Sequence, residues 1–519
     1  LFRSTSEGDD DDFPSITGMI ARYSASGLTN EQMTENPVWV DKTGNGHDIQ
    51  LKNFSWKGMS GVGGYGDENY QTFYKFTLDD YVFIATPPGV KHMNFTFRVT
   101  GLQPGNKLTL AFFGTTNTVY GTWDKDGIYT VNSAVVEVGK PVYFYNGYGA
   151  TRGEFTIEIL SLYPGAPVFD GVDDCGTCNN FPILTKEKGY TVVALRQWDQ
   201  DFLNTTLTGG LLSTRNYSTG EGVAFEKIES SNKGYWNLGA GGIIDFAKSP
   251  FTWQTSKQYN NVGILKGDKN HGKPLCVGCG LSGGQQCGRF AIWELVFLDH
   301  DATEEELTKI KDYFVKTYPW LFPDQAWTVV GKTNEDEDRA TIANITGNGN
   351  DLILSNFGFA EGSGYNEEGE YAGYLVTDGV DDKITSSIFE MGNDWTVIGD
   401  WELINTGKND NAGIVKFNSI VVYNYNPILI NIKNGRNNLI PDQNTVNAIC
   451  SDGRIYSKDW KESIYNEETE STSKNLLTIG YSGNDYTKIA FRNLAIYPTV
   501  LSKEDCIKAY NYLQTLKSK

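Results

Sequence analysis

One pattern occurs twice in this 519-residue sequence, and the repeat constrains the fold more than any other feature. Its first two landmarks are a short polar segment and a Thr-Gly-Asn-Gly turn that leads into an apolar run. Its last two are an Asp-Gly-Val-Asp-Asp turn and an apolar strand-like run before a helix. In the first copy they are Gly27–Glu31, Thr43–Phe54, Phe169–Asp174 and Glu294–Leu298; in the second, Gly331–Glu335, Thr346–Phe357, Thr377–Asp382 and Asn493–Tyr497. Four landmarks in one order indicate one domain present twice.

The spacing of the landmarks predicts an inserted domain. The Thr-Gly-Asn-Gly turn recurs after 303 residues, from Thr43 to Thr346, whereas the Asp-Gly-Val-Asp-Asp turn recurs after 208, from Asp170 to Asp378. The first copy therefore holds 95 additional residues between these landmarks. Short strand-like runs alternate there with turn signals, which is typical of a small β-sandwich. An independent domain is tolerated best at an exposed loop whose ends lie close together.

These boundaries predict four segments in an all-β chain. They are an acidic N-terminal tail at 1–17, a discontinuous first domain at 18–68 and 166–322, the inserted domain at 69–165 and a second domain at 326–519. An aromatic content of 13% and 57 glycines favour strands and turns over helical bundles. Each repeated domain is expected to end in one covering helix, with start signals at Thr303–Glu306 and Ser502–Asp505.

The net charge excludes some partners. Asp and Glu number 64 against 44 Lys and Arg, which gives a formal charge of −20. Nucleic acid and anionic membrane surfaces require a basic face, so neither is an expected partner. No run of the sequence approaches the roughly 18 apolar residues of a membrane span. We therefore expect no membrane span.

The order of the motifs resembles the laminin-G-like, concanavalin A-like lectin and glucanase domain. The resemblance implies that each copy is a β-sandwich of two curved antiparallel sheets, with a smaller, jelly-roll-like sandwich inserted in the first. The strings Gly331–Arg339, Thr346–Asp351 and Gly362–Tyr365 resemble a narrower subgroup. That subgroup comprises virion and tail-fibre components of phages that infect gut Bacteroidetes, including crAss-like phages.

The resemblance implies a non-enzymatic structural protein on the virion surface, a tail-fibre, head-fibre or decoration component assembled in the host cytoplasm. Its partners would be other virion proteins or host-surface polysaccharide, and fibres of this kind are commonly homo-trimers. A bacterial cell-surface glycan-binding protein is the alternative. A glycan-cleaving enzyme is disfavoured, because the Glu-x-Asp-x-x-Glu pattern of glucanases on this fold is absent.

Paired aspartates accompany the third landmark in both copies, Asp173 with Asp174 and Asp381 with Asp382. Beside a glycine turn such carboxylates usually accept hydrogen bonds from the backbone, which is the expected role here. Calcium ligation is the alternative, since hard cations prefer carboxylate and carbonyl oxygens. No specific calcium motif supports it.

Two C-x-x-C pairs predict a structural zinc site. Its expected ligands are Cys175, Cys178, Cys276 and Cys279, and Cys287 could replace one of them. The second copy lacks these cysteines at the matching places, so they entered the fold as a set. Two disulfides or free thiols remain open alternatives. Folding in a reducing cytoplasm favours zinc over disulfides.

Aromatic side chains are the candidate platforms for sugar binding. Packing within the sandwiches is the competing role for each of them, because a sandwich core needs many aromatic residues. The candidates are Trp123, Tyr145 and Tyr148 in the inserted domain and Trp236 and Trp253 in the first copy.

Overall fold

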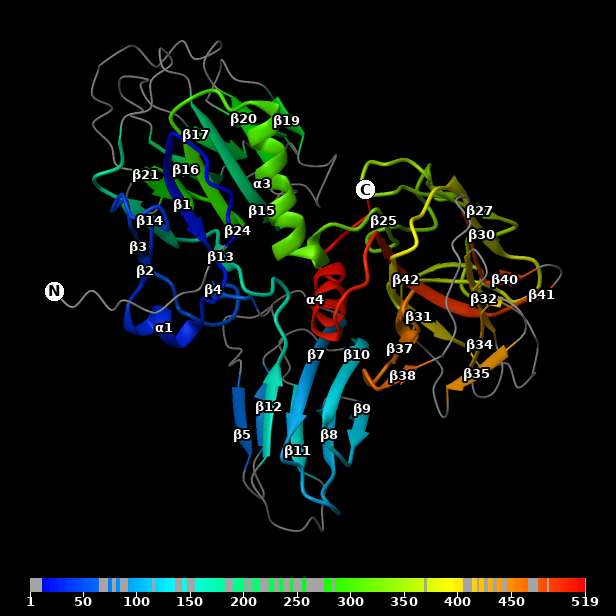
Figure 1. Cartoon of the computed structure of the whole chain (residues 1–519). Helices are drawn as coiled ribbons and strands as arrows, with labels where there is room; N and C mark the ends of the chain where they lie inside the picture. The colour runs from blue at the N-terminus through cyan, green and yellow to red at the C-terminus, as the bar shows by residue number, and fades with distance from the viewer. Residues whose placement is uncertain are drawn as a thin grey trace.

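In the computed structural model, strands dominate and helices are few, which confirms the all-β prediction (Figure 1). The structure describes residues 12–64, 73–76, 81–84, 92–113, 117–135, 142–146, 155–182, 190–199, 202, 207, 209–214, 224–227, 233–236, 243–245, 254–257, 275–281, 285–367, 371–404, 413–417, 420–423, 428–432, 436–440, 446–464, 475–482 and 485–518.

The described strands of the predicted first domain, expected at 18–68 and 166–322 and called the first module below, lie in two sheets. The first has the order β20 (Gln254–Lys257), β15 (Thr191–Trp198), β24 (Arg289–Leu298), β13 (Pro167–Asp170) and β4 (Gly61–Val62), and β1 (Met19–Ser24) also pairs with β24. The second has the order β19 (Ile243–Asp245), β18 (Lys233–Trp236), β17 (Ala224–Lys227), β16 (Gly209–Ser213), β21 (Leu275–Val277), β14 (Cys175–Cys178), β3 (Ile49–Lys52) and β2 (Val38–Trp39), joined by β22 (Cys279–Leu281) and β23 (Gln285–Cys287). Side chains of both sheets share one core, which includes Trp39, Val192 and Val277.

The described residues of the inserted domain also form two sheets, each of four strands. One has the order β10 (Gly127–Val135), β7 (His92–Thr100), β12 (Phe155–Ile159) and β5 (Phe73–Phe76). The other has the order β6 (Tyr81–Ile84), β11 (Val142–Asn146), β8 (Leu108–Phe113) and β9 (Asn117–Trp123). In Figure 1 these strands form a separate body below the two larger modules.

The described strands of the predicted second domain, expected at 326–519 and called the second module below, repeat the two-sheet arrangement, and β25 begins one residue before the expected boundary. One sheet has the order β28 (Gly364–Asn366), β29 (Tyr374–Val376), β42 (Ile489–Tyr497), β31 (Thr396–Leu403), β36 (Val446–Cys450), β37 (Arg454–Ser457) and β38 (Glu462–Ile464), with β25 (Gln325–Thr328) on β42. The other has the order β26 (Thr341–Ile342), β27 (Leu352–Ser355), β30 (Lys383–Phe389), β39 (Asn475–Ile479), β32 (Gly413–Phe417), β33 (Ile420–Tyr423), β34 (Ile428–Ile432) and β35 (Arg436–Ile440). A hairpin of β40 (Tyr481–Ser482) and β41 (Asp485–Tyr486) follows β39.

Each repeated module ends in the expected helix, α3 (Glu304–Thr317) and α4 (Lys503–Leu513). Thr303 caps α3 in a reciprocal capping box with Glu306, whereas Ser502 caps α4 through the amide of Asp505. A turn of 3-10 helix, η1 (Pro319–Leu321), follows α3. The short helix α1 (Asn30–Glu35), which lies on the first sequence landmark, was not predicted.

The first landmark clamps the same backbone position in both modules. The Asn30 side-chain amide donates to the Val62 carbonyl at 3.1 Å and accepts from the Val62 amide at 2.8 Å. Asn334 makes the same two bonds with Tyr365, both at 2.8 Å. The position before each clamped residue is glycine, and a Cβ on Gly61 would lie 2.7 Å from Asn30 Oδ1. The repeated Asn and Gly are therefore required by one close approach of chain segments.

The Thr-Gly-Asn-Gly landmark is also structural. Asp41 Oδ1 accepts from the Arg22 amide at 3.1 Å, which fixes the turn to β1. In the second module Asn344 Oδ1 accepts from the Ala326 amide at 3.2 Å, which fixes the equivalent turn to β25. Glycines with positive φ complete both turns, and the left-handed region is accessible to glycine without strain.

A shared core joins the modules at α4. The rings of Trp293, Trp320 and Tyr512 meet in pairs with centroids 5.6 to 6.0 Å apart, so α4 of the second module packs on the first. The Tyr512 hydroxyl also donates to Gln197 Oε1 at 2.9 Å. Arg98 of the inserted domain lies 3.7 Å from Glu504 of α4. Helix α4 therefore lies where the three parts of the chain meet (Figure 1).

Candidate functional site

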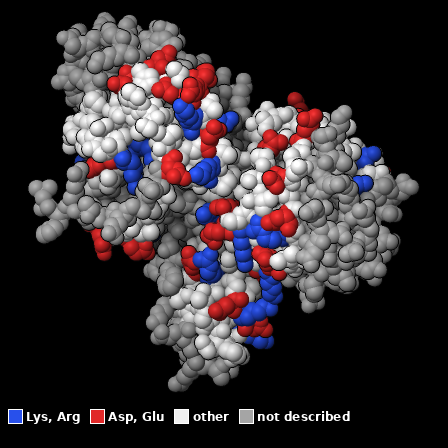
Figure 2. Space-filling view, in the orientation of Figure 1, with Lys and Arg blue, Asp and Glu red and all other residues white. Residues whose placement is uncertain are grey.

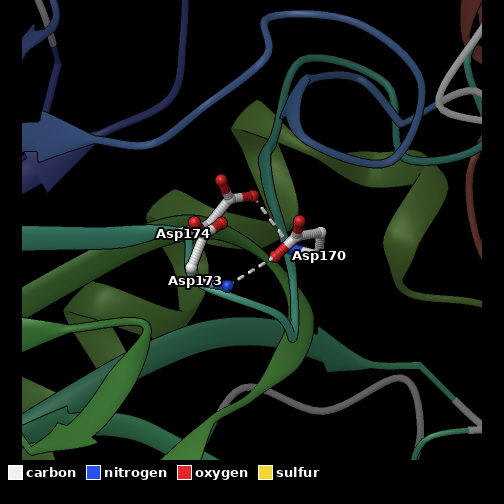
Figure 3. A group of neighbouring side chains, drawn as sticks. All are labelled: Asp170, Asp173 and Asp174. Atoms are coloured by element: carbon white, nitrogen blue, oxygen red, sulfur yellow. Dashed lines mark hydrogen bonds between the residues drawn. The ribbon is translucent and has the colours of Figure 1, made fainter. Parts of the chain in front are cut away.

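The Asp-Gly-Val-Asp-Asp turn contains three carboxylates that lie close together (Figure 3). One oxygen from each of Asp170, Asp173 and Asp174 lies within 4.8 Å of the others. Asp170 Oδ1 accepts from the Val172 amide at 2.7 Å and closes the turn. Asp174 Oδ2 accepts from the Asp170 amide at 2.9 Å, and its Oδ1 accepts from the Ser60 hydroxyl at 3.0 Å. The carboxylates of Asp170 and Asp174 therefore already accept from backbone amides of the turn, whereas Asp173 contributes its amide, which donates to Asp170 Oδ1 at 3.4 Å.

The second module builds the same turn with the same bonds. Asp378 Oδ1 accepts from the Val380 amide, and Asp382 Oδ2 accepts from the Asp378 amide, both at 2.8 Å. Asp381 completes a second group of carboxylates within 4.8 Å. Turn capping, the expected role of the paired aspartates, accounts for the contacts of Asp174 and Asp382, whereas Asp173 and Asp381 take part in the turns through their backbone amides. Calcium ligation was the alternative role. Within the described residues, the only observation that supports it is the proximity of the carboxylates, and a group of carboxylates does not by itself make a calcium site.

Burial changes the titration of the inner aspartates. Asp174 is fully buried, and desolvation raises its pKa to about 8. The hydrogen bonds that it accepts from Asp170 and Ser60 have the opposite effect and lower the pKa. Burial likewise raises the pKa of Asp382. A carboxyl group buried without a cation favours its neutral form.

The predicted zinc ligands are not all brought together. Cys175 and Cys178 both lie on β14, and positions three apart on a strand face opposite sides of the sheet. Cys178 packs in the core between the two sheets, and its thiol donates to Asn180 Oδ1 at 3.2 Å. Cys175 faces the other side. The expectation that both sulfurs of this pair turn towards one ion does not fit a strand.

A different group of four cysteines does come together. Cys175, Cys276, Cys279 and Cys287 form a separate buried cluster, and the structure joins Cys279 to Cys287 in a disulfide. Burial raises the pKa of the Cys175 thiol, against the lowering effect of Lys52, and raises the pKa of Cys276 to about 12. The substitution of Cys287 for one ligand, which the sequence left open, matches this cluster.

The aromatic candidates give little indication of a sugar site. Trp123 ends β9, and its half-buried ring packs 4.9 Å from the Phe97 ring and 5.3 Å from the Tyr129 ring, measured between centroids. This contact favours a packing role. Tyr145 and Trp236 lie on β11 and β18, but their side chains are outside the described residues, as are Tyr148 and Trp253 entirely. For these four the binding role stays a prediction.

A buried ion pair in the first module was not predicted from the sequence. Arg22 Nε lies 3.1 Å from Glu294 Oε2, and both side chains are almost completely buried. Glu294 Oε1 also accepts from the hydroxyls of Ser24 at 2.6 Å and Tyr318 at 2.9 Å. The guanidinium lies over the Phe13 ring, 3.9 Å from its centroid. Burial raises the pKa of Glu294, while Arg22 and the hydroxyl donors lower it.

The described surface mixes charges of both signs. Figure 2 shows Lys and Arg interspersed with Asp and Glu over the described part of the visible face. Among the described residues, no helix has the length and apolar character needed to cross a membrane.

Comparisons with known proteins give no family for the chain. No family model matches it, and no curated protein matches it. Among solved structures, Trypanosoma rangeli sialidase in complex with sialic acid is 8% identical, with a TM-score of 0.28 over 78% of this chain and 76% of the sialidase. The botulinum neurotoxin type G receptor-binding domain is 12% identical, with a TM-score of 0.23 over 37% of this chain and 51% of that domain. The serotype D binding domain is 12% identical, with a TM-score of 0.25 over 66% and 88%. These TM-scores are too low to support a conclusion about function.

Proposed function

We propose that this chain is a non-enzymatic structural protein of a phage virion, a tail-fibre, head-fibre or decoration component. In this proposal the two modules are laminin-G-like, concanavalin A-like sandwiches, and the inserted domain is a smaller jelly-roll-like sandwich. The sequence resemblance to phage virion components is the reason for proposing this class of protein. The observation that carries the proposal is that the polar motifs repeated in both modules bind backbone groups of their own fold. Asp170 and Asp378, for example, close equivalent turns.

The connection between the modules supports a structural role. A hinge between two binding modules requires a small or polar interface, since domain interfaces of that kind permit motion. Here the side chains of Trp293, Trp320 and Tyr512 bury aromatic surface between the modules. A rigid arm of sandwiches suits a component that stands on a particle and holds its outer surface at a fixed distance.

The proposed partners are other virion proteins or host-surface polysaccharide. The mixed charges of the described surface suit protein contacts with polar rims. Homo-trimer formation belongs to this proposal as the common assembly of fibres. Size-exclusion chromatography with light scattering of the intact chain measures it.

The location of the chain tests the proposal. We expect mass spectrometry of gradient-purified particles to find the chain at a fixed ratio to the major capsid protein, and antibodies against it to label one part of the particle. Absence from purified particles would overturn the proposal. Recovery on the bacterial outer surface instead would support the alternative, a cell-surface glycan-binding protein.

A second assay addresses catalysis. We expect no release of reducing ends when the intact chain is incubated with host polysaccharide. Release that disappears after substitution of a single carboxylate would replace the structural proposal with a glycan-cleaving enzyme.

A further inference from the structure

We infer that Cys175, Cys276, Cys279 and Cys287 bind one zinc ion when the Cys279–Cys287 disulfide is reduced. This inference does not depend on the virion role, because it concerns a local cluster in the first module. It also revises the ligand set expected from the sequence, with Cys287 in place of Cys178.

Strand pairing places the first two sulfurs on one side of the sheet. Thr177 of β14 lies opposite Cys276 of β21, and Gly176 lies opposite Val277. Cys175 is two positions from Thr177, so it shares a face with Cys276. Cys178 is one position from Thr177 and therefore belongs to the other face, where it packs in the main core.

A turn and a hairpin bring the other two sulfurs over this face. Gly278 has a φ of +94°, which turns the chain between Cys276 and Cys279. The Gly278 and Gly288 backbones are joined by a 2.8 Å hydrogen bond, and the hairpin of β22 and β23 sets Cys279 directly opposite Cys287. Cys279 Sγ lies 3.3 Å from the carbonyl oxygen of Asp174, the residue before Cys175.

The chemistry of the cluster fits zinc. Four cysteine sulfurs are the donor set of closed structural zinc sites, which are tetrahedral and exclude water. All four side chains are at most 5% exposed. The backbone of Cys279 hydrogen-bonds to the Cys276 sulfur, a contact that favours the thiolate. Lys52, opposite Cys175 on β3, supplies a nearby positive charge for the anionic tetrathiolate.

The second module shows that these four positions act as a unit. Strand pairing and the Thr487–Gly480 backbone bond identify the equivalents of Cys175, Cys276, Cys279 and Cys287 as Lys383, Thr478, Tyr481 and Tyr486. The rings of Tyr481 and Tyr486 lie 5.1 Å apart, and Lys383 Nζ lies 5.8 Å from the centre of the Tyr481 ring. The Thr478 hydroxyl donates to the Tyr481 carbonyl at 3.1 Å. The second module therefore secures its hairpin by aromatic and cation–π contacts, whereas the first has a cluster of four buried cysteines at the equivalent place.

The disulfide in the structure is the oxidised form of the same cluster, since a sulfur in a disulfide offers no thiolate to a metal. An external dithiol supplies two electrons and two protons, breaks the Cys279–Cys287 bond and becomes a disulfide itself. Zinc then replaces the protons of four thiols, which leave to the solvent. The cluster can thus hold either a disulfide or a metal.

Metal analysis of the full chain tests this inference. The chain is reduced with a dithiol, loaded with zinc under anaerobic conditions, freed of excess metal and measured by plasma mass spectrometry. We expect about one zinc per chain after reduction and almost none when the disulfide is kept intact. Equal zinc contents with and without reduction would overturn the inference, as would less than about one zinc per five reduced chains.

Matched variants identify the ligands. Cys287→Ser should lose the zinc, whereas Cys178→Ala, which alters a cysteine of the same sheet outside the cluster, should keep it. The reverse pattern would overturn the revised set. Cobalt substitution of the reduced wild-type chain needs no variant. We expect the intense sulfur-to-cobalt charge-transfer and tetrahedral d–d bands of a tetrathiolate site, and a weak octahedral spectrum would contradict it.

Discussion

The two repeated modules keep the same backbone clamps but fill one hairpin with different chemistry. Asn30 and Asn334 hold equivalent strands, and Asp174 and Asp382 accept from equivalent amides. At the hairpin, however, four cysteines of the first module stand where the second has Lys383, Thr478, Tyr481 and Tyr486. Groups that satisfy buried backbone donors are hard to replace, because an unpaired buried amide is costly. A side-chain cluster can be exchanged as a whole.

The buried ion pairs also differ between the two modules. The first module pairs Arg22 with Glu294, whereas the equivalent of Glu294 in the second module is Asn493, opposite Thr328 on β25. The second module instead brings Arg492 to 3.9 Å from Asp400, whose carboxylate also accepts from the Tyr374 hydroxyl. Among the described residues, both modules therefore contain a buried pair, at different places on equivalent sheets.

The largest difference between the modules in the free energy of unfolding should come from loss of the Arg22–Glu294 pair. Glu294→Ala leaves Arg22 buried without its carboxylate, and removal of one member of a buried pair costs about 3–5 kcal/mol. Asn493→Ala removes no charge and should cost less, about 1–3 kcal/mol. Urea unfolding of both variants measures the losses. Equal losses would show that the Arg22–Glu294 pair contributes nothing particular to the first module.

The asparagine clamps should give matched losses instead. Asn30→Ala and Asn334→Ala each leave a buried backbone amide and carbonyl without a partner, and each should cost about 1–3 kcal/mol. Hydrogen exchange at Val62 and Tyr365 should accelerate only in the module that carries the substitution. A large loss for one variant and none for the other would refute the equivalence of the first landmark.

Helix caps should differ modestly. Thr303→Ala removes a reciprocal capping box from α3 and should cost about 1–2 kcal/mol, whereas Ser502→Ala removes a one-way cap from α4 and should cost about 0.5–1 kcal/mol. Thermal unfolding followed by circular dichroism compares the variants. A larger effect at Ser502 would reverse the expected order.

The smallest effect is a pH dependence confined to the first module. Burial lowers the pKa of His300, but its contacts with Asp299 and Glu306 outweigh burial and raise the pKa overall. The contribution of the protonated ring is thus fully present below its unfolded pKa of about 6.5 and disappears as the pH rises through the folded value. The loss should be a few tenths of a kcal/mol, since the ring is partly exposed. His300→Thr, which copies Thr499 of the second module, should remove this dependence. An unchanged pH profile in that variant would exclude His300 as its source.

The sequence predicted those features of the fold that depend on a few neighbouring residues. The glycine turns and the capped start of α3 follow from short-range signals, and the structure contains both. The arrangement of the cysteines could not be predicted from spacing alone. Cys276–Cys279 spans a turn at Gly278, but the identical spacing at Cys175–Cys178 lies on a strand, where two residues between cysteines separate the sulfurs.

Long-range contacts could not be predicted from one sequence. Arg22 and Glu294 are 272 residues apart, and only the pairing of β1 with β24 brings them together. The packing of Tyr512 against Trp293 and Trp320 likewise depends on how the two modules meet. A single sequence without an alignment carries no signal for such pairs.

Hydrogen exchange of the intact chain tests the central claim, that one backbone framework is used twice, most directly. The equivalent amides are Val62 with Tyr365, Asp170 with Asp378, and Gly288 with Thr487. We predict that both members of every pair exchange far more slowly than unprotected amides. A pair in which one amide is protected and its equivalent exchanges at the unprotected rate would contradict the claim.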